Sequence, residues 1–466
     1  MGKEFTVHAP FDGAPLATLS TIEWPEVDRR LHVAHELYKN RDAWIPTPKR
    51  IQILHKAAQI MRARAEDMAK AAAREGGKPL MDSRVELARA IDGVENCIEV
   101  LRSEQGRVVP MNVNAASAGR HAFTRREPIG VVVAVSAFNH PLNLVVHQVA
   151  PAIAVGCPVL VKPAAATPLS CIAFLDILYE AGLPRDWCQI ALTANSQIAT
   201  QMVSDPRVAF FSFIGSARIG WMLRSKLAPG ARCALEHGGA APAIVAADAD
   251  LDDALPRLAK GGFYHAGQVC VSVQRVFADA QIAKSVAERL GTLGNKMVVG
   301  DPTDAKTEVG PLINHDEVKR VDEWVKQAVA AGAKLVSGGK VLSPSTYAPT
   351  VLLDPPADAR VTNEEIFGPV ICVYSSKSLD ESIKRANEVP FSFQTAVFTR
   401  SLETALRAYA RLNGSAVMVN DHTAFRVDWM PFAGLSVSGH GVGGIPSTMH
   451  EMAVEKMMVL RSNELL

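Results

Sequence analysis

The sequence predicts an α/β protein made of two lobes, each built on a parallel β-sheet covered by helices. From residue 130 onward, short β-rich runs such as GVVVAVSAF, CPVLVKP and RVAFFSFIG alternate with helical stretches such as TPLSCIAFLDILYEAGL and SARIGWMLRSKL. This alternation is typical of βαβ units in a parallel sheet. A second alternating series starts at APAIVAADAD, and 466 residues are enough for two or three domains.

The first hundred residues are predicted to be mainly helical. PKRIQILHKAAQIMRARAEDMAKAAAREGG carries apolar residues at helical spacing, Gly76 and Gly77 form a stop signal, and a second helix is expected over 83–105. With the first alternating series, these helices indicate a doubly wound domain of the nucleotide-binding type. We assign residues 1–106 and 129–238 to this domain.

The second lobe is predicted over residues 239–440. After APAIVAADAD we expect a helix to about residue 266 and then the strand SVQRVFAD. Helices near 281–295 and 314–332 follow, and the strands QTAVFTR and SAVMVN complete the lobe.

Two segments fit neither lobe. They are residues 107–128 and residues 441–466, which include the strand-like run EKMMVLRSNELL. Detached strands of this kind often pair across a subunit interface. We therefore predict that these segments form a small β arm for oligomerisation.

Composition argues against several functional classes. Charged residues make up 21% of the chain and the formal net charge is +1, so no field exists that would gather nucleic acid or an anionic membrane. No apolar run reaches the roughly 18–20 residues of a membrane span, and MGKEFTVHAP has no hydrophobic signal core, so we expect a cytoplasmic protein. The cysteines are scattered without a CxxC pair, which argues against a disulfide scaffold and a zinc site. They are Cys97, Cys157, Cys171, Cys188, Cys233, Cys270 and Cys372.

Polar residues stand inside an apolar run in SAFNHPLNLVVHQVAPAIAVGCPVLVKPA. Asn139, His140 and His147 occupy positions where the pattern otherwise predicts core, and the run ends near Lys162. A histidine on an apolar face is most often a hydrogen-bonded core residue, so the pattern alone identifies no site.

Cys270 and Glu236 are candidates for catalysis. Cys270 ends FYHAGQVC, at the junction of a predicted helix and strand, where a thiol can be exposed in a cleft. A lone cysteine is more often inert core. Glu236 ends a β-like run before a double glycine in ALEHGGAAPAIV. That position suits a general base as well as a solvated turn carboxylate.

Taken together, the motifs resemble the NAD(P)-dependent aldehyde dehydrogenase superfamily over nearly the whole chain. FNHPLN resembles the family's WNFP, FIGSARIG resembles FTGSTEVG, and LEHGG resembles LELGG. VLVKPA, GQVC, EEIFGPV and PFAGLSVSGHGVGG also match, and all stand in the family's order. FNHPLNLVVHQ, LEHGGAAP and FRVDWMPFAG are most similar to the branch of phosphonoacetaldehyde and lactaldehyde dehydrogenases. The resemblance implies a Rossmann-type cofactor domain, a second α/β catalytic domain and a small β oligomerisation arm.

The resemblance implies a role for each matching catalytic residue. Cys270 matches the nucleophile, whose thiolate attacks the aldehyde carbon to give a thiohemiacetal. The Asn139 amide, with the backbone N–H of Cys270, matches the donors that stabilise the oxyanion. Hydride transfer leaves a thioester, and Glu236 matches the base that activates a water to release the carboxylate.

Other motifs imply the cofactor contacts. Lys162 matches the lysine at the adenosine ribose, and Gly215 and Ser216 match the pyrophosphate contact at a helix N-terminus. Glu365 matches the carboxylate at the nicotinamide ribose, and Phe367 matches the ring beside the nicotinamide.

The chain departs from NAD-specific relatives at Ala165, where they commonly carry a glutamate that binds the adenosine ribose. Loss of the carboxylate removes repulsion against a 2′-phosphate, so we expect NAD or NADP as cofactor. Relatives also often carry lysine where this chain has Gln148 and leucine where it has His237.

Four residues are candidates for substrate binding. Arg89 matches an arginine of relatives that act on phosphorylated or phosphonated aldehydes, but Val269 replaces the arginine that those relatives place before the nucleophile. Arg426 lies on the loop that closes the substrate entrance in this family. With His140 and His147, these arginines predict a polar, basic substrate tunnel. Solvated surface positions for both arginines are the open alternative.

We therefore expect NAD(P)-dependent oxidation of a short aldehyde with an anionic or hydroxylated tail. Phosphonoacetaldehyde, sulfolactaldehyde, lactaldehyde and succinate semialdehyde are examples. The alternatives are a broad-specificity dehydrogenase of neutral aldehydes, a non-catalytic structural relative, and an acylating enzyme, which the presence of Glu236 argues against. The resemblance implies a homodimer or homotetramer, and we expect no metal, nucleic-acid or membrane partner.

Overall fold

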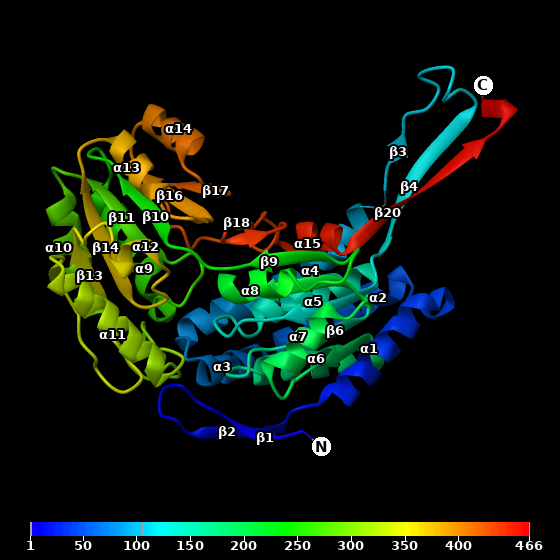
Figure 1. Cartoon of the computed structure of the whole chain (residues 1–466), viewed down its shortest axis with the longest axis horizontal. Coiled ribbons are helices and arrows are strands. Elements are labelled where there is room, and N and C mark those ends of the chain that lie inside the picture. Colours follow the sequence, from blue (N-terminus) through cyan, green and yellow to red (C-terminus); the bar gives the residue numbers. More distant parts are fainter. Residues whose placement is uncertain (1, 105, 466) are drawn as a thin grey trace.

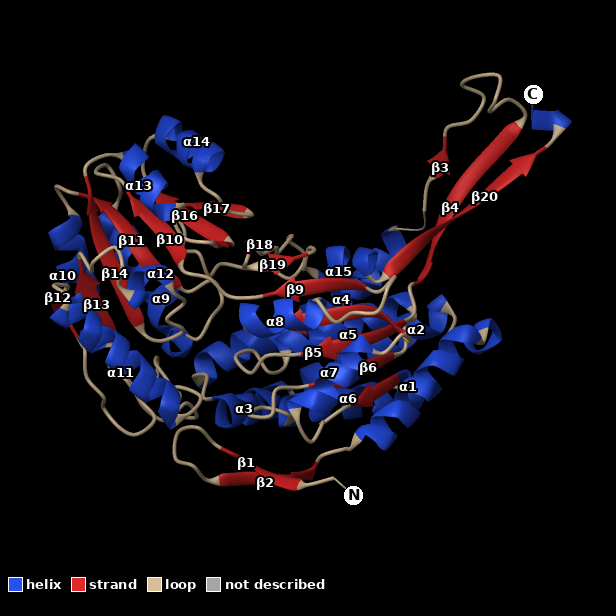
Figure 2. Cartoon of the chain, viewed as in Figure 1, coloured by secondary structure: helices blue, strands red, loops and turns tan. Residues whose placement is uncertain are grey.

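The computed structural model describes residues 2–104 and 106–465, which form two lobes and a projecting arm (Figure 1). The predicted α/β class is confirmed, because each lobe contains a mainly parallel sheet flanked by helices (Figure 2). None of the helices in these residues is both long enough and apolar enough to span a membrane.

The first lobe contains a six-stranded sheet in the order β19-β9-β8-β5-β6-β7, parallel except at β19. Its strands are β5 (Val131–Val135), β6 (Val159–Lys162), β7 (Cys188–Ile190), β8 (Val208–Ile214), β9 (Arg232–Glu236) and β19 (Gly439–His440). The chain order reverses between β5 and β8. Ligands of open parallel sheets bind at such a switch point, beyond the carboxyl ends of the strands.

Alternate residues of β5 serve separate cores on the two faces of this sheet. Val132 and Ala134 pack in one core, whereas Val131 and Val133 pack in the other. The first face is covered by α2 (Thr47–Ala63), α3 (Ala65–Gly76), α4 (Leu80–Ser103), α5 (Asn143–Val155), α6 (Leu169–Glu180) and α15 (Ile445–Glu451). The second face is covered by α1 (Trp24–Lys39), α7 (Ser196–Ser204) and α8 (Ala217–Arg224).

Buried glutamates from α3 and α4 cap the helices that follow β5 and β6. The backbone N–H groups of Leu142 and Asn143 donate to Glu86 Oε1 at 3.0 and 2.9 Å, at the start of α5. Lys78 Nζ donates to Glu86 Oε2 at 2.5 Å, and both side chains are 2% exposed. Glu75 accepts bonds from the first residues of α6 in the same way. These carboxylates satisfy helix N–H groups that have no partner within their own helix.

The second lobe contains a seven-stranded sheet in the order β12-β13-β14-β11-β10-β16-β17, parallel except at β12. Its strands are β10 (Ala241–Val245), β11 (Val273–Asp279), β12 (Lys334–Ser337), β13 (Thr350–Leu353), β14 (Val370–Ser376), β16 (Gln394–Phe398) and β17 (Ala416–Val419). Its helices are α9 (Leu251–Phe263), α10 (Ala283–Lys296), α11 (His315–Ala330), α12 (Arg360–Asn363), α13 (Leu379–Ala386) and α14 (Leu402–Arg411). The helix expected to reach residue 266 ends at Phe263, because the next residues form a tight turn.

The arm is a three-stranded antiparallel sheet of β3 (Val108–Val109), β4 (Arg120–Pro128) and β20 (Ala453–Arg461), and it projects from the first lobe (Figure 1). Within residues 441–466, helix α15 lies outside the arm, because Ile445 and Met449 pack in the core of the first lobe. Smaller elements are the hairpin of β1 (Glu4–His8) and β2 (Pro15–Ser20), the pair β15 (Phe391–Ser392) and β18 (Leu435–Ser436), and the 3₁₀ turns Arg41–Ala43, Arg185–Trp187 and Asn463–Leu465.

Replacing the buried carboxylate of Glu86 tests its role in the fold. Glu86→Gln leaves the Lys78 ammonium buried without a counter-charge, so we expect the free energy of unfolding to fall by about 3–5 kcal/mol. Urea unfolding followed by circular dichroism measures the change. Glu66→Gln, which removes an exposed carboxylate paired with Arg84, is the matched control and should hardly change the midpoint. Equal midpoints for the two variants would contradict the assignment.

Candidate active site

The candidate residues of the first lobe lie at the carboxyl edge of its sheet. Asn139 follows β5, Lys162 ends β6, Ser216 follows β8, and Glu236 ends β9. Because parallel strands end at the same edge, residues far apart in the chain meet there. The sheet therefore brings the predicted catalytic and cofactor residues of this lobe to one side of the molecule.

A strained turn presents Cys270 to this edge. The turn Tyr264–Gly267 follows α9 and has positive φ angles at His265 (50°) and Ala266 (52°), a conformation that costs free energy in residues other than glycine. Gly267 (φ 70°) has no alternative, because a Cβ atom would lie 2.1 Å from the carbonyl oxygen of Gly368. Cys270 is partly exposed, whereas the other cysteines are buried, which fits a reactive thiol.

Asn139 is tied to the same turn. Its Nδ2 donates to the carbonyl oxygen of Gln268 at 2.9 Å. The Gln268 side chain in turn donates to the carbonyls of His265 and Pro311, both at 3.1 Å, and accepts from the N–H of Ile313 at 2.9 Å. The Asn139 amide has a second N–H that this contact leaves free. The buried Gln268 thus links the asparagine loop to the cysteine loop, and sequence reasoning missed it.

The Glu236 carboxylate packs against Gly443, where any side chain would collide with it. A Cβ atom at Gly443 would approach Glu236 Oε1 to 2.1 Å. The nearest cation is Arg426, whose Nη1 lies 4.0 Å from Glu236 Oε2. Burial raises the pKa of Glu236, and the charge of Arg426 partly offsets that rise. A buried carboxyl group with a raised pKa is suited to proton transfer near neutral pH.

The surroundings of Cys270 favour the neutral thiol. Burial raises the pKa of Cys270 to about 12, Arg426 acts in the opposite direction, and the carboxylates of Glu236 and Glu365 add to the rise. The thiolate is the nucleophilic form of cysteine. Arg426 is therefore the group in the described site that favours the reactive form.

Residues predicted to contact the cofactor meet the requirements of a nucleotide. Burial raises the pKa of Glu365 to about 8, and its Oε1 accepts the N–H of Gly239 at 3.2 Å. Gly238 leaves room for this carboxylate, because a Cβ atom there would lie 1.6 Å from Oε1. Phe367 packs edge-on against Phe138, with ring centroids 5.8 Å apart. A carboxylate beside an aromatic ring suits a ribose joined to a flat base.

The other predicted cofactor residues lie along β6 and α8. Burial lowers the pKa of Lys162, which ends β6, and Ala165 is exposed beyond it. Ser216, after Gly215, is the N-cap of α8, and its side chain does not cap the helix itself. Free N–H groups at a helix N-terminus favour a phosphate. These groups together fit a dinucleotide. The Lys162 ammonium and the N-terminus of α8 can donate hydrogen bonds to it, and the Glu365 carboxylate can accept them.

A buried carboxylate, Asp428, organises the predicted substrate residues. Arg89 donates to it through Nη2 and Nε at 2.8 and 3.1 Å, Asn143 Nδ2 donates at 3.1 Å, and His147 Nε2 lies 2.6 Å away. His147 Nδ1 lies 3.3 Å from Arg426 Nη2. Arg89, His147 and Arg426 are therefore brought together, and neither arginine is a fully solvated surface residue.

His140 belongs to a second polar group beside this network. Its ring is perpendicular to the ring of His265, with centroids 6.2 Å apart. Burial, and then the nearby ammonium of Lys78, lower the pKa of His140 well below its usual value. Burial lowers the pKa of His265 in the same way, so His140 and His265 are both neutral at neutral pH. The pattern around His140 gave no sign of Lys78, which is distant in the sequence.

Two departures from the family pattern have structural explanations. Gln148 Nε2 donates to the carbonyl of Val135 at 3.2 Å and to Ser212 at 3.0 and 3.1 Å, so it links α5 to the two strands at the switch point. His237 Nδ1 lies 3.0 Å from the carbonyl oxygen of Gly215, and its ring packs edge-on against Trp221.

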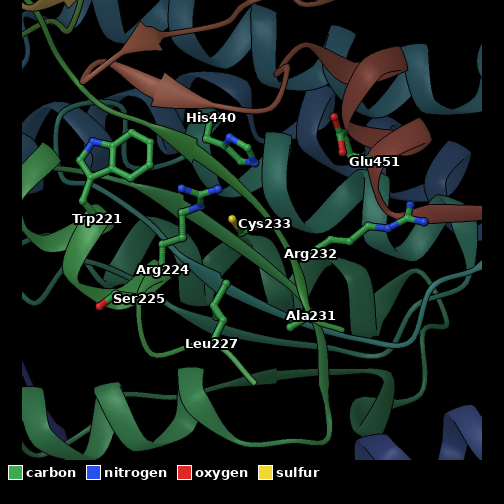
Figure 3. A pocket seen from close by; sticks show the side chains of 9 residues that line it. All are labelled: Trp221, Arg224, Ser225, Leu227, Ala231, Arg232, Cys233, His440 and Glu451. Carbon is green, nitrogen blue, oxygen red and sulfur yellow. The ribbon is translucent and has the colours of Figure 1, made fainter. Parts of the chain in front are cut away.

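A hollow lies against α8 and β9, and its lining does not include the catalytic candidates (Figure 3). Arg224, Arg232 and Glu451 are the charged residues among those that line it. It is lined by Trp221, Arg224, Ser225, Leu227, Ala231, Arg232, Cys233, His440 and Glu451.

Known proteins are similar to this chain over almost its full length. A model of the aldehyde dehydrogenase family matches residues 1–458. A 3-sulfolactaldehyde dehydrogenase from Priestia aryabhattai is 36% identical over 446 residues, which cover 96% of this chain and 92% of that protein. The crystal structure of aldehyde dehydrogenase 21 from Physcomitrella patens, in complex with the reaction product succinate, has a TM-score of 0.95 at 34% identity and covers 100% of this chain and 96% of that one. A glyceraldehyde-3-phosphate dehydrogenase from Methanocaldococcus jannaschii, complexed with NADP, has a TM-score of 0.93 at 32% identity, with coverage of 99% and 100%.

The raised pKa of Cys270 has a direct consequence for alkylation. Because the pKa is about 12, the thiolate fraction should grow about tenfold for each pH unit well below that value. We expect the rate of iodoacetamide labelling to rise in this way from pH 7 to pH 9, as measured by intact-protein mass. Cys270→Ser should remove the label, because the other cysteines are buried. A labelling rate that levels off below pH 8 would show that the thiol is already ionised.

Proposed function

Since this chain belongs to the aldehyde dehydrogenase family and uses NAD or NADP, we propose that it oxidises a short aldehyde with an anionic or hydroxylated tail. The product is the corresponding carboxylate. The observation that carries the proposal is the buried Arg426, whose side chain is 8% exposed and lies 4.0 Å from the candidate base Glu236. A buried cation beside the reaction centre favours substrates that bring a negative charge.

The names of relatives support this substrate class. The Priestia aryabhattai relative is named for 3-sulfolactaldehyde, which carries a sulfonate and a hydroxyl group. The Physcomitrella patens enzyme holds succinate, the product expected from an aldehyde with a carboxylate tail. Sulfolactaldehyde, succinate semialdehyde, lactaldehyde and phosphonoacetaldehyde are our candidate substrates.

Catalysis begins with attack of the Cys270 thiolate on the aldehyde carbon. A carbon–sulfur bond forms, and the carbonyl oxygen becomes an oxyanion. The free N–H of the Asn139 amide and the backbone N–H of Cys270 donate to this oxyanion, and donors fixed in advance lower the barrier. The bond from Asn139 Nδ2 to the Gln268 carbonyl, which ties the amide to the cysteine turn, supports this role. The charge of Arg426 favours the thiolate during the attack.

A bound nicotinamide supplies the hydride acceptor that the oxidation needs. Loss of hydride from the thiohemiacetal leaves a thioester on Cys270. Glu236 then takes a proton from a water molecule, which attacks the thioester carbon and releases the carboxylate and the thiol. The raised pKa of Glu236 makes the carboxylate a better base for this step.

The chain's own residues would hold either nicotinamide cofactor. Glu365 and Phe367 would hold the nicotinamide half, Lys162 would hold the adenosine ribose, and Gly215 with Ser216 would hold the pyrophosphate. Ala165 is exposed and carries no charge, so a 2′-phosphate meets no repulsion there.

We also propose a cytoplasmic homodimer or homotetramer assembled through the arm. The outer strand β20 exposes Met457, Met458, Val459 and Leu460 to solvent in the single chain. An exposed apolar strand is stabilised by burial against another subunit. All cysteines are free, which is typical of a reducing compartment.

The catalytic roles predict a different defect for each variant. Cys270→Ala should lower the rate of nicotinamide reduction by about 10³-fold or more, because no covalent intermediate can form. Glu236→Gln should still give a burst of reduced nicotinamide equal to the number of sites, but its steady-state rate should fall by about 10²-fold or more. Stopped-flow absorbance measures both phases.

Controls come from the hollow in Figure 3, whose lining includes Cys233 and Glu451. Cys233→Ala removes a thiol and Glu451→Gln removes a carboxylate at residues outside the candidate site, so both variants should retain the wild-type rate. If Glu236→Gln kept its full steady-state rate, Glu236 would lose its assigned role.

A further inference from the structure

We propose that Asp428 determines which substrate charge the site prefers: by neutralising Arg89 and orienting His147, it leaves Arg426 as the one cation that the described residues offer to the substrate tail. The site then selects an aldehyde with a singly charged oxyanion, a sulfonate or a carboxylate, over a doubly charged phosphonate or a neutral tail. This inference rests on the proposed function, because it concerns the substrate of the same site.

Arg89 is paired with Asp428. Two bonds of 2.8 and 3.1 Å join the guanidinium to both carboxylate oxygens. Asp428 is 1% exposed, so this pair is poorly screened by water. Despite burial, which alone would raise it, the pKa of Asp428 lies well below its usual value because His147 and Arg89 bond to the carboxylate. The charge of Arg89 is thus balanced within the protein.

Asp428 fixes the tautomer of His147. The ionised carboxylate of Asp428 can only accept hydrogen bonds, so the neutral imidazole must carry its proton on Nε2, which lies 2.6 Å from Oδ1. Nδ1 is then an acceptor, and it faces Arg426 Nη2 at 3.3 Å. Burial and the charge of Arg426 lower the pKa of His147 to about 4, which keeps the ring neutral. Asp428 therefore orients Arg426 through the imidazole.

The guanidinium of Arg426 is only partly paired. Its guanidinium stacks on Phe432 at 3.5 Å from the ring centroid, and its side chain is 8% exposed. Within residues 2–104 and 106–465, Arg426 Nε has no hydrogen-bond partner although it is buried. The distance of 4.0 Å to Glu236 is too long for a hydrogen bond. Arg426 therefore retains donors for an oxyanion.

The other charged groups that the structure describes near the site do not add a second free cation. Lys78 is paired with Glu86 at 2.5 Å, and both are buried. His140 and His265 have pKa values well below the usual histidine value, because of burial first and the nearby Lys78 second. A second negative charge on the tail would thus face the carboxylates of Asp428 and Glu236 without a counter-ion.

The test compares two-carbon aldehydes that differ only in the tail. Sulfoacetaldehyde carries one negative charge, phosphonoacetaldehyde carries mostly two at pH 8.5, and glycolaldehyde carries none. The monomethyl ester of phosphonoacetaldehyde keeps the tetrahedral phosphorus but carries one charge. We expect kcat/KM for sulfoacetaldehyde and the methyl ester to exceed the values for the other two by about tenfold or more.

Two variants separate the residue roles. Asp428→Asn frees Arg89, so the ratio of kcat/KM for phosphonoacetaldehyde to that for sulfoacetaldehyde should rise by about tenfold or more. Arg426→Gln should remove the advantage of sulfoacetaldehyde over glycolaldehyde. A general loss of structure lowers all four values together and leaves these ratios unchanged. The wild-type comparison decides the charge preference even where a variant does not fold.

The outcomes distinguish this inference from the function on which it rests. If wild-type enzyme oxidises phosphonoacetaldehyde or glycolaldehyde as well as sulfoacetaldehyde, the inference is wrong while the proposed oxidation of short aldehydes stands. An unchanged phosphonate-to-sulfonate ratio in folded Asp428→Asn would overturn the role of Asp428. If none of the four aldehydes, nor lactaldehyde or succinate semialdehyde, is oxidised with NAD or NADP, the proposed function itself fails, and the inference with it.

Discussion

The buried carboxylate of Glu86 is the contact on which the geometry of the site depends. It holds the ammonium of Lys78 with one oxygen and the first N–H groups of α5 with the other. The loop before α5 carries Asn139 and His140, and the helix itself carries Asn143 and His147. Because a buried charge without a partner is costly, this pair fixes where α5 begins relative to α4. Asn139, a candidate donor to the oxyanion, and His147, a candidate substrate residue, are therefore both positioned by the contacts of Glu86.

The candidate active site places two acidic groups, Cys270 and Glu236, near the positively charged Arg426. Burial raises the pKa of both Cys270 and Glu236, which favours their protonated forms, and the charge of Arg426 partly offsets that rise for each. Arg426 is in turn oriented by His147, which depends on Asp428. One guanidinium therefore connects the candidate nucleophile, the candidate base and the candidate substrate residues. In the function that we propose, a substrate tail that binds Arg426 changes the charge near both Cys270 and Glu236, so substrate recognition and chemistry are coupled at this residue.

Much of the fold could be predicted because its signals are local. The βαβ alternation predicted the two parallel sheets. The resemblance of the motifs around Asn139, Glu236 and Cys270 to those of the aldehyde dehydrogenase family identified these residues as candidates. The end of α9 was misplaced because His265 and Ala266 adopt left-handed angles that no residue preference predicts. Pairings between distant segments were also missed. Arg89 and Asp428 are separated by 339 positions, and no periodicity links them.

The most direct test of this account is the mass of a trapped covalent intermediate. Glu236→Gln enzyme is mixed with cofactor and sulfoacetaldehyde, quenched in acid within the burst phase, and digested for mass spectrometry. The account predicts that the peptide containing Cys270 gains the mass of the acyl group, and that the gain disappears on treatment with hydroxylamine, which cleaves thioesters. Reduced nicotinamide formed in a full burst with no acyl group on Cys270 would contradict the covalent mechanism proposed for this chain.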